Sequence, residues 1–135
     1  MHPRLLLFVA VFLPALAHAQ AWPTRPVHFV IPFAQGGLME TVLAVTREFV
    51  EKRLGQRIVV ENRPGGGGNV GAQAVLAAPA DGYTILVPPS NVLVTNQFVF
   101  SNMPFDPLKD FVPITMLVDV PLVLSVSDRF PPRTL

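Results

Sequence analysis

A run of glycines is the feature of this sequence that most clearly could do chemistry. Residues 61–72 read ENRPGGGGNVGA, with an apolar run before them and small, helix-tolerant residues after them. This order predicts a strand, a bare loop and a helix that starts near Asn69. A glycine loop lets backbone N–H groups approach a ligand closely, and the N-terminus of a helix adds a partial positive charge. The stretch therefore favours the binding of an anion.

The glycine run also fits other interpretations. Gly66, Gly68 and Gly71 match the spacing of a dinucleotide-binding loop, but that motif expects an acidic residue after the next strand to hold the ribose. The next predicted strand, 83–87, is followed by two prolines and Ser90. A Walker phosphate loop is excluded because no Lys-Ser or Lys-Thr follows the glycines. A tight turn without a ligand stays open, since the local motif supports it as well as it supports any function.

Strands and helices alternate around this loop. Strands are predicted at 27–31, 57–61 and 83–87, and helices at 38–54 and 70–78. Short apolar strands that alternate with helices imply an α/β fold with a parallel sheet and right-handed crossovers, whose ligands bind beyond the carboxyl ends of the strands. Three loops of small and amide residues come to that edge: Gln35–Gly37, Gly65–Asn69 and Ser90-Asn91. Together they are better evidence for a site than any one of them.

The first helix and the later part of the chain carry further predictions. We expect the helix at 38–54 to bury an apolar stripe of Leu38, Val42, Val45 and Phe49, widened by Met39, Leu43, Val50 and Leu54. Residues 92–100 are compatible with a helix or a strand. Asp106-Pro107 predicts one short helical turn ending at Phe111. Further strands are predicted at 112–118 and 122–126.

The amino-acid composition argues against several classes of function. The 135 residues are 50% hydrophobic and 14% charged with a net charge of +1, which favours one packed domain and gives no support for nucleic-acid binding. Cysteine is absent, and Glu40 and Glu61 have the wrong neighbours for a metal cluster. No serine has a histidine partner placed by a motif, and His28 lies in a strand. We therefore predict no catalytic residues, no metal, no cofactor and no enzymatic activity.

The N-terminus is typical of a secretory signal peptide. Arg4 supplies the positive region, and 5–16 is an apolar segment too short to span a bilayer. Ala17-His18-Ala19 fits the rule for signal cleavage, so residues 1–19 are expected to be removed and the mature chain to begin at Gln20. A buried helix or a membrane anchor is the less favoured alternative. The sequence thus predicts export to a bacterial periplasm.

From Trp22 to the last residue, the sequence resembles the Bug/TctC family of periplasmic receptors for tripartite tricarboxylate transporters. The blocks that carry the resemblance are WPxRPV from Trp22, IPFAxGG from Ile31, LGQ from Leu54, VVENRPG from Val59, GGNVGA from Gly67, PxDGYT from Pro79 and DPLKDF from Asp106. Seven blocks in the right order make a far more specific match than the glycine spacing.

The resemblance implies a type II periplasmic-binding-protein fold, with a parallel-sheet lobe that has helices on both faces. It identifies residues 20–135 as the N-terminal part of lobe 1, truncated near the crossover to a missing second lobe. Family members capture a small carboxylate between the lobes and deliver it to a membrane permease, and a complete receptor is expected to be a monomer. Carried onto this chain, the ligand-binding residues are Phe33, Gln35, Gly36, Gly37, Gly67, Gly68, Asn69, Ser90 and Asn91.

This sequence departs from the family pattern in two of the ligand loops. Leu38-Met39-Glu40 stands where the family commonly has Gly-Thr-Asp, so a helix-capping hydroxyl is lost at Met39. Pro88-Pro89 replaces a glycine and a small hydroxyl residue, which removes two N–H groups. The expected function is capture of a carboxylate by a receptor fragment. The alternative is a truncated, inert secreted remnant with no ligand of its own.

Overall fold

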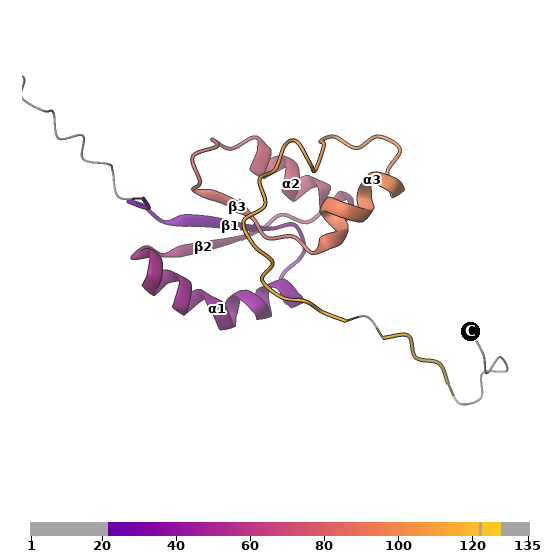
Figure 1. The fold of residues 1–135 in the computed structure, drawn as a ribbon, viewed down its shortest axis with the longest axis horizontal. Coiled ribbons are helices and arrows are strands. Elements are labelled where there is room, and N and C mark those ends of the chain that lie inside the picture. Colours follow the sequence, from indigo (N-terminus) through magenta and orange to yellow (C-terminus); the bar gives the residue numbers. More distant parts are fainter. Residues whose placement is uncertain (1–21, 122, 128–135) are drawn as a thin grey trace, which may run out of the picture.

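A computed structural model describes residues 22–121 and 123–127, so the predicted signal peptide lies outside the described residues. Its centre is a parallel sheet of three strands: β1 (Val27–Ile31), β2 (Ile58–Asn62) and β3 (Thr84–Leu86) (Figure 1). The strand order is β2-β1-β3. In the register, Phe29 of β1 lies opposite Val60 on one side and Ile85 on the other. The predicted parallel sheet is confirmed, with β2 shifted by one residue from the predicted range.

Helices cover both faces of this sheet. α1 (Leu38–Leu54) lies on one side, and α2 (Asn69–Leu76) and the short α3 (Asn96–Val99) lie on the other (Figure 1). A 3-10 turn, η1 (Gly66–Gly68), precedes α2, and a π-helical turn, η2 (Asn91–Thr95), precedes α3. The sequence allowed a helix or a strand for residues 92–100, and the structure shows helical turns there. Gly37 and Gly55 bound α1, and Gly55 ends it in the left-handed conformation (φ 66°) that glycine adopts without strain.

Two apolar cores lie on opposite faces of the sheet because side chains alternate along each strand. On one face, Phe29 and Ile31 pack with Leu43 of α1 and with Ile58 of β2. On the other face, Ala72 of α2 packs with Val92, Phe105 and Leu86. Phe33, just beyond the end of β1, contacts both clusters. This double contact anchors the start of the first predicted ligand loop.

The buried face of α1 differs from the predicted one. Leu43 is buried, and Met39, Val50 and Leu54 pack beside it, whereas Leu38, Val45 and Phe49 are exposed by 51, 79 and 63%. The residues that were expected only to widen the apolar stripe therefore form the buried face of α1. Two apolar stripes run along this helix, and helical spacing alone does not say which one meets the sheet. One end of the helix is fixed by Glu51, whose carboxylate accepts the Ile58 N–H of β2 at 2.7 Å.

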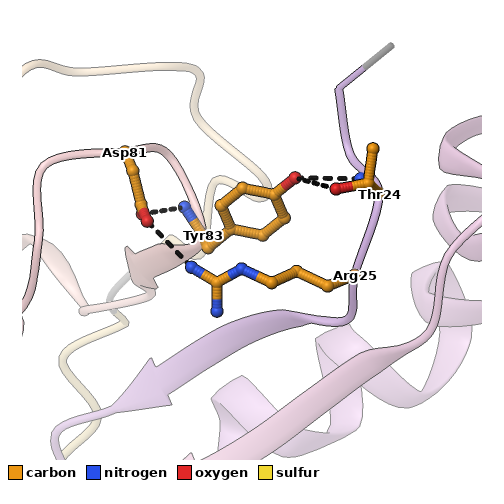
Figure 2. A network of polar contacts seen from close by, with 4 residues as sticks. All are labelled: Thr24, Arg25, Asp81 and Tyr83. Carbon is orange, nitrogen blue, oxygen red and sulfur yellow. Dashed lines mark hydrogen bonds and ion pairs between the residues drawn. The ribbon is translucent and has the colours of Figure 1, made fainter. Parts of the chain in front are cut away.

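The segment before β1 is tied to the turn before β3 (Figure 2). Arg25 forms an ion pair with Asp81 at 2.8 Å, and its guanidinium lies 4.0 Å from the centre of the Tyr83 ring. The Tyr83 hydroxyl accepts the Thr24 N–H at 2.9 Å, and Trp22 packs against the same ring. These contacts lie at the amino end of the sheet, opposite the predicted ligand edge, and we interpret them as structural.

The chain beyond residue 105 forms one turn and then no regular element within its described part. Asp106 accepts the Leu108 N–H at 3.0 Å and closes a turn to Asp110, which confirms the predicted capping role. The predicted strand at 112–118 is wrong: these residues form no ladder, and Val112 is 89% exposed. A β-strand needs a partner for its backbone groups, and no described segment pairs with this one. The strand predicted at 122–126 includes Leu122, which is not described; residues 123–126 form none.

Candidate functional site

The carboxyl edge of the sheet contains a pocket of about 230 Å³ between the ends of β1 and β3. In the order β2-β1-β3, this is the place where successive crossovers go to opposite faces, and α/β sheets bind ligands at such switch points. The wall is formed by the end of β1, the start of α1 and the loop after β3: Ile31, Phe33, Ala34, Gly37, Leu38, Met39, Glu40 and Pro89. Of the three predicted ligand loops, only the one after β1 lines this cavity, together with Pro89, which directly precedes the predicted Ser90-Asn91 loop.

The loop after β1 is held by its own side chains and by β2. Glu40, in the first turn of α1, accepts the Gly36 N–H with its carboxylate. Asn62, at the end of β2, donates from Nδ2 to the Phe33 carbonyl at 3.0 Å. Gly36 has φ +85°, where a side chain would be strained, whereas Gly37 has φ −84° and space for a Cβ. Of the two glycines, only Gly36 is required by the backbone conformation.

In the glycine loop after β2, some backbone N–H groups donate to carbonyls of the same loop. All four residues from Gly65 to Gly68 have positive φ. The Gly68 N–H donates to the Gly65 carbonyl at 2.9 Å, and the Asn69 N–H donates to the Gly66 carbonyl. The predicted role of the Gly68 and Asn69 amides as anion donors is therefore not met by these N–H groups. Asn69 is the first residue of α2, in agreement with the predicted helix start, and its side chain makes no capping hydrogen bond.

Close packing explains three of the loop glycines. A Cβ on Gly68 would lie 2.5 Å from Val92 Cγ2, and one on Gly67 would lie 3.1 Å from Phe100 Cζ. A Cβ on Gly71 would lie 2.6 Å from the Cβ of Pro32, which follows β1. Of the glycines with dinucleotide-like spacing, Gly68 and Gly71 are thus required by packing inside the protein, whereas Gly66 is favoured by its positive φ. The loop backbone forms a tight turn, and its Gly68 and Asn69 N–H groups are used within that turn.

Asn69, which follows the glycine loop, is 7% exposed, and Asn96 beside it is 5% exposed. Asn96 is the first residue of α3, and its Nδ2 donates to Asn69 Oδ1 at 2.8 Å and to the Gly67 carbonyl at 3.0 Å. No described residue pairs with Asn69 Nδ2. Within the described part of the chain, every fully buried side-chain nitrogen or oxygen has a partner, so Asn69 Nδ2 is not fully enclosed. Asn69 therefore offers a free donor beside the glycine loop.

Gln35, Ser90 and Asn91 were also predicted to bind the ligand, but they do not line the pocket. Ser90 precedes η2 and is exposed, and Asn91 is the half-buried first residue of that turn. Gln35 is exposed. Phe33 and Gly68 are in contact, since a Cβ on Gly68 would lie 3.3 Å from the Phe33 ring, so the first and second loops meet directly. The nine predicted residues share one edge of the sheet, but only Phe33 and Gly37 line the pocket.

Sequence reasoning missed Asn62, Asn96 and Glu40. Asn62 and Asn96 each donate to a carbonyl of a ligand loop 29 residues away along the chain. Asn62 lies within the family block VVENRPG and could have been singled out there. Asn96 lies between blocks in a segment of undecided secondary structure, so nothing in its neighbourhood marked it. Glu40 was dismissed as a metal ligand, and its position in the first turn of a helix is the signal that predicts a bond to a loop N–H.

The groups with shifted pKa values lie away from this edge. The Ile58 N–H and Arg47 lower the pKa of Glu51, and the Thr24 hydrogen bonds lower that of Tyr83. Lys109 lowers the pKa of Asp106, whose charge raises the pKa of Lys109. Perturbed acids and bases are typical of catalytic sites, but none of these four groups lines the pocket.

Other candidate sites are weaker. A larger surface hollow of about 500 Å³ lies at the opposite edge, lined mainly by charged and polar residues near the end of α1, and no predicted residue belongs to it. Among the described residues, no three His, Cys, Asp or Glu side chains gather where they could hold a metal. No helix in that part of the chain is long and apolar enough to cross a bilayer.

Known proteins resemble this chain in sequence. Residues 42–135 match the tripartite tricarboxylate transporter family receptor, TctC. Protein BugT of Bordetella pertussis is 36% identical over 132 residues, and a UPF0065 protein of Bordetella bronchiseptica is 37% identical over 121 residues. These alignments cover 93% and 90% of this chain but only 40% and 36% of the two relatives. The chain thus spans well under half the length of the curated relatives it matches.

Solved structures agree with the sequence matches. MatC from Rhodopseudomonas palustris with bound malate aligns with a TM-score of 0.67 and 37% identity, over 70% of this chain and 32% of that protein. A second R. palustris protein, solved with adipate, aligns with a TM-score of 0.60 and 37% identity, over 64% of this chain and 29% of that protein. The family is one of receptors, in agreement with the prediction of no enzymatic activity. With its parallel sheet, its seven sequence blocks and these matches, the chain belongs to the tripartite tricarboxylate transporter (TctC) receptor family.

Proposed function

We propose that this chain forms part of a periplasmic receptor that captures a small carboxylate at the carboxyl edge of the β2-β1-β3 sheet. The observation that carries the proposal is the pocket at the switch point between β1 and β3, whose lining residue Phe33 packs against Gly68 of the glycine loop, next to Asn69. Two structural relatives hold malate and adipate, which are both dicarboxylates. A ligand of the same class suits an edge that offers amide groups and apolar walls, with Glu40 as its one ionisable group among the residues that line the pocket.

The charge of Glu40 indicates where a ligand carboxylate would sit. Glu40 is the only ionisable residue among those that line the pocket. Two like charges 4 Å apart repel by about 4 kcal/mol at an effective dielectric constant of 20. A carboxylate would therefore avoid the Glu40 side and approach the glycine loop, where the Asn69 amide can donate a hydrogen bond. We propose Phe33, Gly37 and Asn69 as the principal contacts, with Gln35, Gly36, Gly67, Gly68, Ser90 and Asn91 around them.

Export and delivery complete the proposed function. The predicted cleavage after Ala19 would release the mature chain into the periplasm, where a receptor of this family would pass its ligand to the permease of a tripartite transporter. Domain 20–135 is proposed to be the N-terminal part of lobe 1. The exposed segment 112–118 is compatible with a crossover that finds its partners outside the described residues.

A thermal-shift screen followed by calorimetry tests the proposal. The product of the gene, purified from periplasm, is titrated with malate, adipate, succinate, citrate and glutamate. We expect at least one acid to raise the melting temperature and to bind with one-site stoichiometry. As a control for non-specific anion binding, Lys52→Ala alters the hollow at the opposite edge and should leave the affinity unchanged. A folded protein that binds none of these acids would refute a carboxylate receptor.

A further inference from the structure

The hydrogen bonds around Asn96 determine which way the Asn69 amide faces. A backbone carbonyl can only accept, so the Asn96 atom 3.0 Å from the Gly67 oxygen must be the NH₂ group. The same nitrogen lies 2.8 Å from Asn69, so the Asn69 atom at that contact must be the acceptor, Oδ1. The NH₂ group of Asn69 is then directed away from Asn96. The chemistry of one carbonyl thus sets the orientation of both amides.

We propose that Asn96 is a positioning residue that holds the NH₂ group of Asn69 ready to donate to the ligand carboxylate. This inference rests on the proposed carboxylate site and adds the group that orients its donor. Without Asn96, the Asn69 amide could turn over and present its oxygen, which repels an anion. The backbone N–H groups of Gly68 and Asn69 are already used inside the loop, so the side-chain donor matters more here than it would in an open loop.

The surroundings hold Asn96 firmly enough for this role. Asn96 is 5% exposed, and Val92, one turn earlier on the same helical face, is fully buried against the glycine loop. The Phe100 ring covers Gly67 one turn later, so three side chains at four-residue spacing contact the loop in succession. Buried polar groups must be hydrogen-bonded, and the Asn96 NH₂ group finds both of its partners in this loop. Its side chain therefore has little freedom to leave this position.

The decisive variant is Asn69→Asp, because it separates structure from binding. The aspartate still offers an oxygen to Asn96 Nδ2, and a negative charge at the first residue of α2 suits the helix dipole. The thermal midpoint should therefore stay within about 2 °C of the wild type, a shift that corresponds to a small fraction of the stability. The donor, however, becomes an acceptor, so the affinity for the carboxylate found in the wild-type screen should fall by at least about 10-fold.

Asn96→Ala tests the same idea without adding charge. It removes the group that orients Asn69, and we expect the affinity to fall about 3- to 10-fold at a temperature where the variant is folded, as checked by circular dichroism. The control is Gln97→Ala, at the neighbouring residue, whose Nε2 donates to the Val94 carbonyl on the exposed side of the helix. It should bind with wild-type affinity.

The outcomes are distinguishable. If the wild type binds no carboxylate, the proposed function fails and this inference fails with it. If the wild type binds but Asn69→Asp or Asn96→Ala keeps its affinity, the receptor stands and the positioning role alone is refuted. A purely structural role for the Asn69–Asn96 pair predicts that Asn96→Ala, which adds no charge, binds normally at a temperature where it is folded. Loss of binding in both variants at nearly unchanged stability of Asn69→Asp is the result we expect.

Discussion

Replacing Gly68 by alanine should be severely destabilising, for two separate reasons. Gly68 has φ +99°, and a residue with a side chain in the positive-φ region is strained by about 1–2 kcal/mol. Its new Cβ would also lie 2.5 Å from Val92 Cγ2, and overpacking of this kind costs about 1–3 kcal/mol. Together these terms predict a loss of about 2–5 kcal/mol, out of about 5–15 kcal/mol for a typical domain.

Gly66→Ala provides a matched control for the backbone strain. Gly66 has φ +54° in the same loop, but its new Cβ would come no closer than 3.7 Å to any other side chain. Only the backbone term applies, so we expect a loss of about 1–2 kcal/mol. Both variants are compared with the wild type by urea unfolding, followed by far-ultraviolet circular dichroism at one protein concentration. Equal losses in the two variants would refute the packing part of the argument.

A double-mutant cycle measures the contact between Gly68 and Val92 directly. Val92→Ala removes the methyl group in conflict with the new Cβ, and by itself it should be destabilising because Val92 is fully buried. Combined with Gly68→Ala, it should recover about 1–3 kcal/mol relative to the sum of the single changes. Additive losses would mean that η2 moves away from the loop and that the glycine is required by its backbone alone.

Three further predictions concern packing, pH and export. In Gly71→Ala the new Cβ would lie 2.7 Å from the Pro32 Cα, a backbone atom with little room to move, so α2 should be forced off the sheet with a loss of about 1–3 kcal/mol in thermal unfolding. The pKa of Glu51 is lowered from 4.5 chiefly by the Ile58 N–H. The ionised carboxylate therefore stabilises the fold above pH 4.5, and this stabilisation is lost as the pH falls through the folded-state pKa. The difference in urea midpoint between the wild type and Glu51→Gln should vanish at low pH, and a difference that grows on acidification would contradict this. N-terminal sequencing of periplasmic protein should give a mature chain that begins after Ala19, and an intact leader there would count against export.

The strands and helices up to residue 87 could be predicted because turn residues bound them. Pro32 ends β1, Gly37 and Gly55 bound α1, and the predicted ranges 27–31 and 38–54 agree with the structure. Each element is local, and its limits are set by residues within it or next to it. The strand at 112–118 failed for the opposite reason, since a strand requires a partner and apolar composition does not supply one.

The buried face of α1 was less predictable than its limits. Leu38, Val45 and Phe49 are as apolar as Met39, Leu43 and Val50, so both stripes suit a helix that packs on a sheet. The choice depends on how the helix is rotated, and contacts at its end, such as Glu51 with β2, influence that rotation. Such contacts join separate elements and leave no periodic signal in the sequence.

The candidate site shows the same division between local and long-range features. The glycine run, the loop positions and the shared edge followed from spacing and from the parallel topology. The free donor did not, because the sequence predicted only that a helix starts near Asn69, whereas the Asn69 side chain accepts a hydrogen bond from Asn96, 27 residues away. A cap and a long-range amide pair need the same residue type at the same position, so the sequence cannot distinguish between them.

Glycine loops at a binding edge need support from outside, and this chain provides it with asparagine amides. Glycine gains close approach but loses more conformational freedom on folding than any other residue. The loop after β1 is fixed by Asn62 on the Phe33 carbonyl, and the loop after β2 is fixed by Asn96 on the Gly67 carbonyl. These two amides are neutral and add no charge, whereas the third support, Glu40 on the Gly36 N–H, does carry one. In the proposed receptor, selectivity would rest on two groups, the donor of Asn69 and the carboxylate of Glu40, which together would place a ligand's negative end beside the glycine loop.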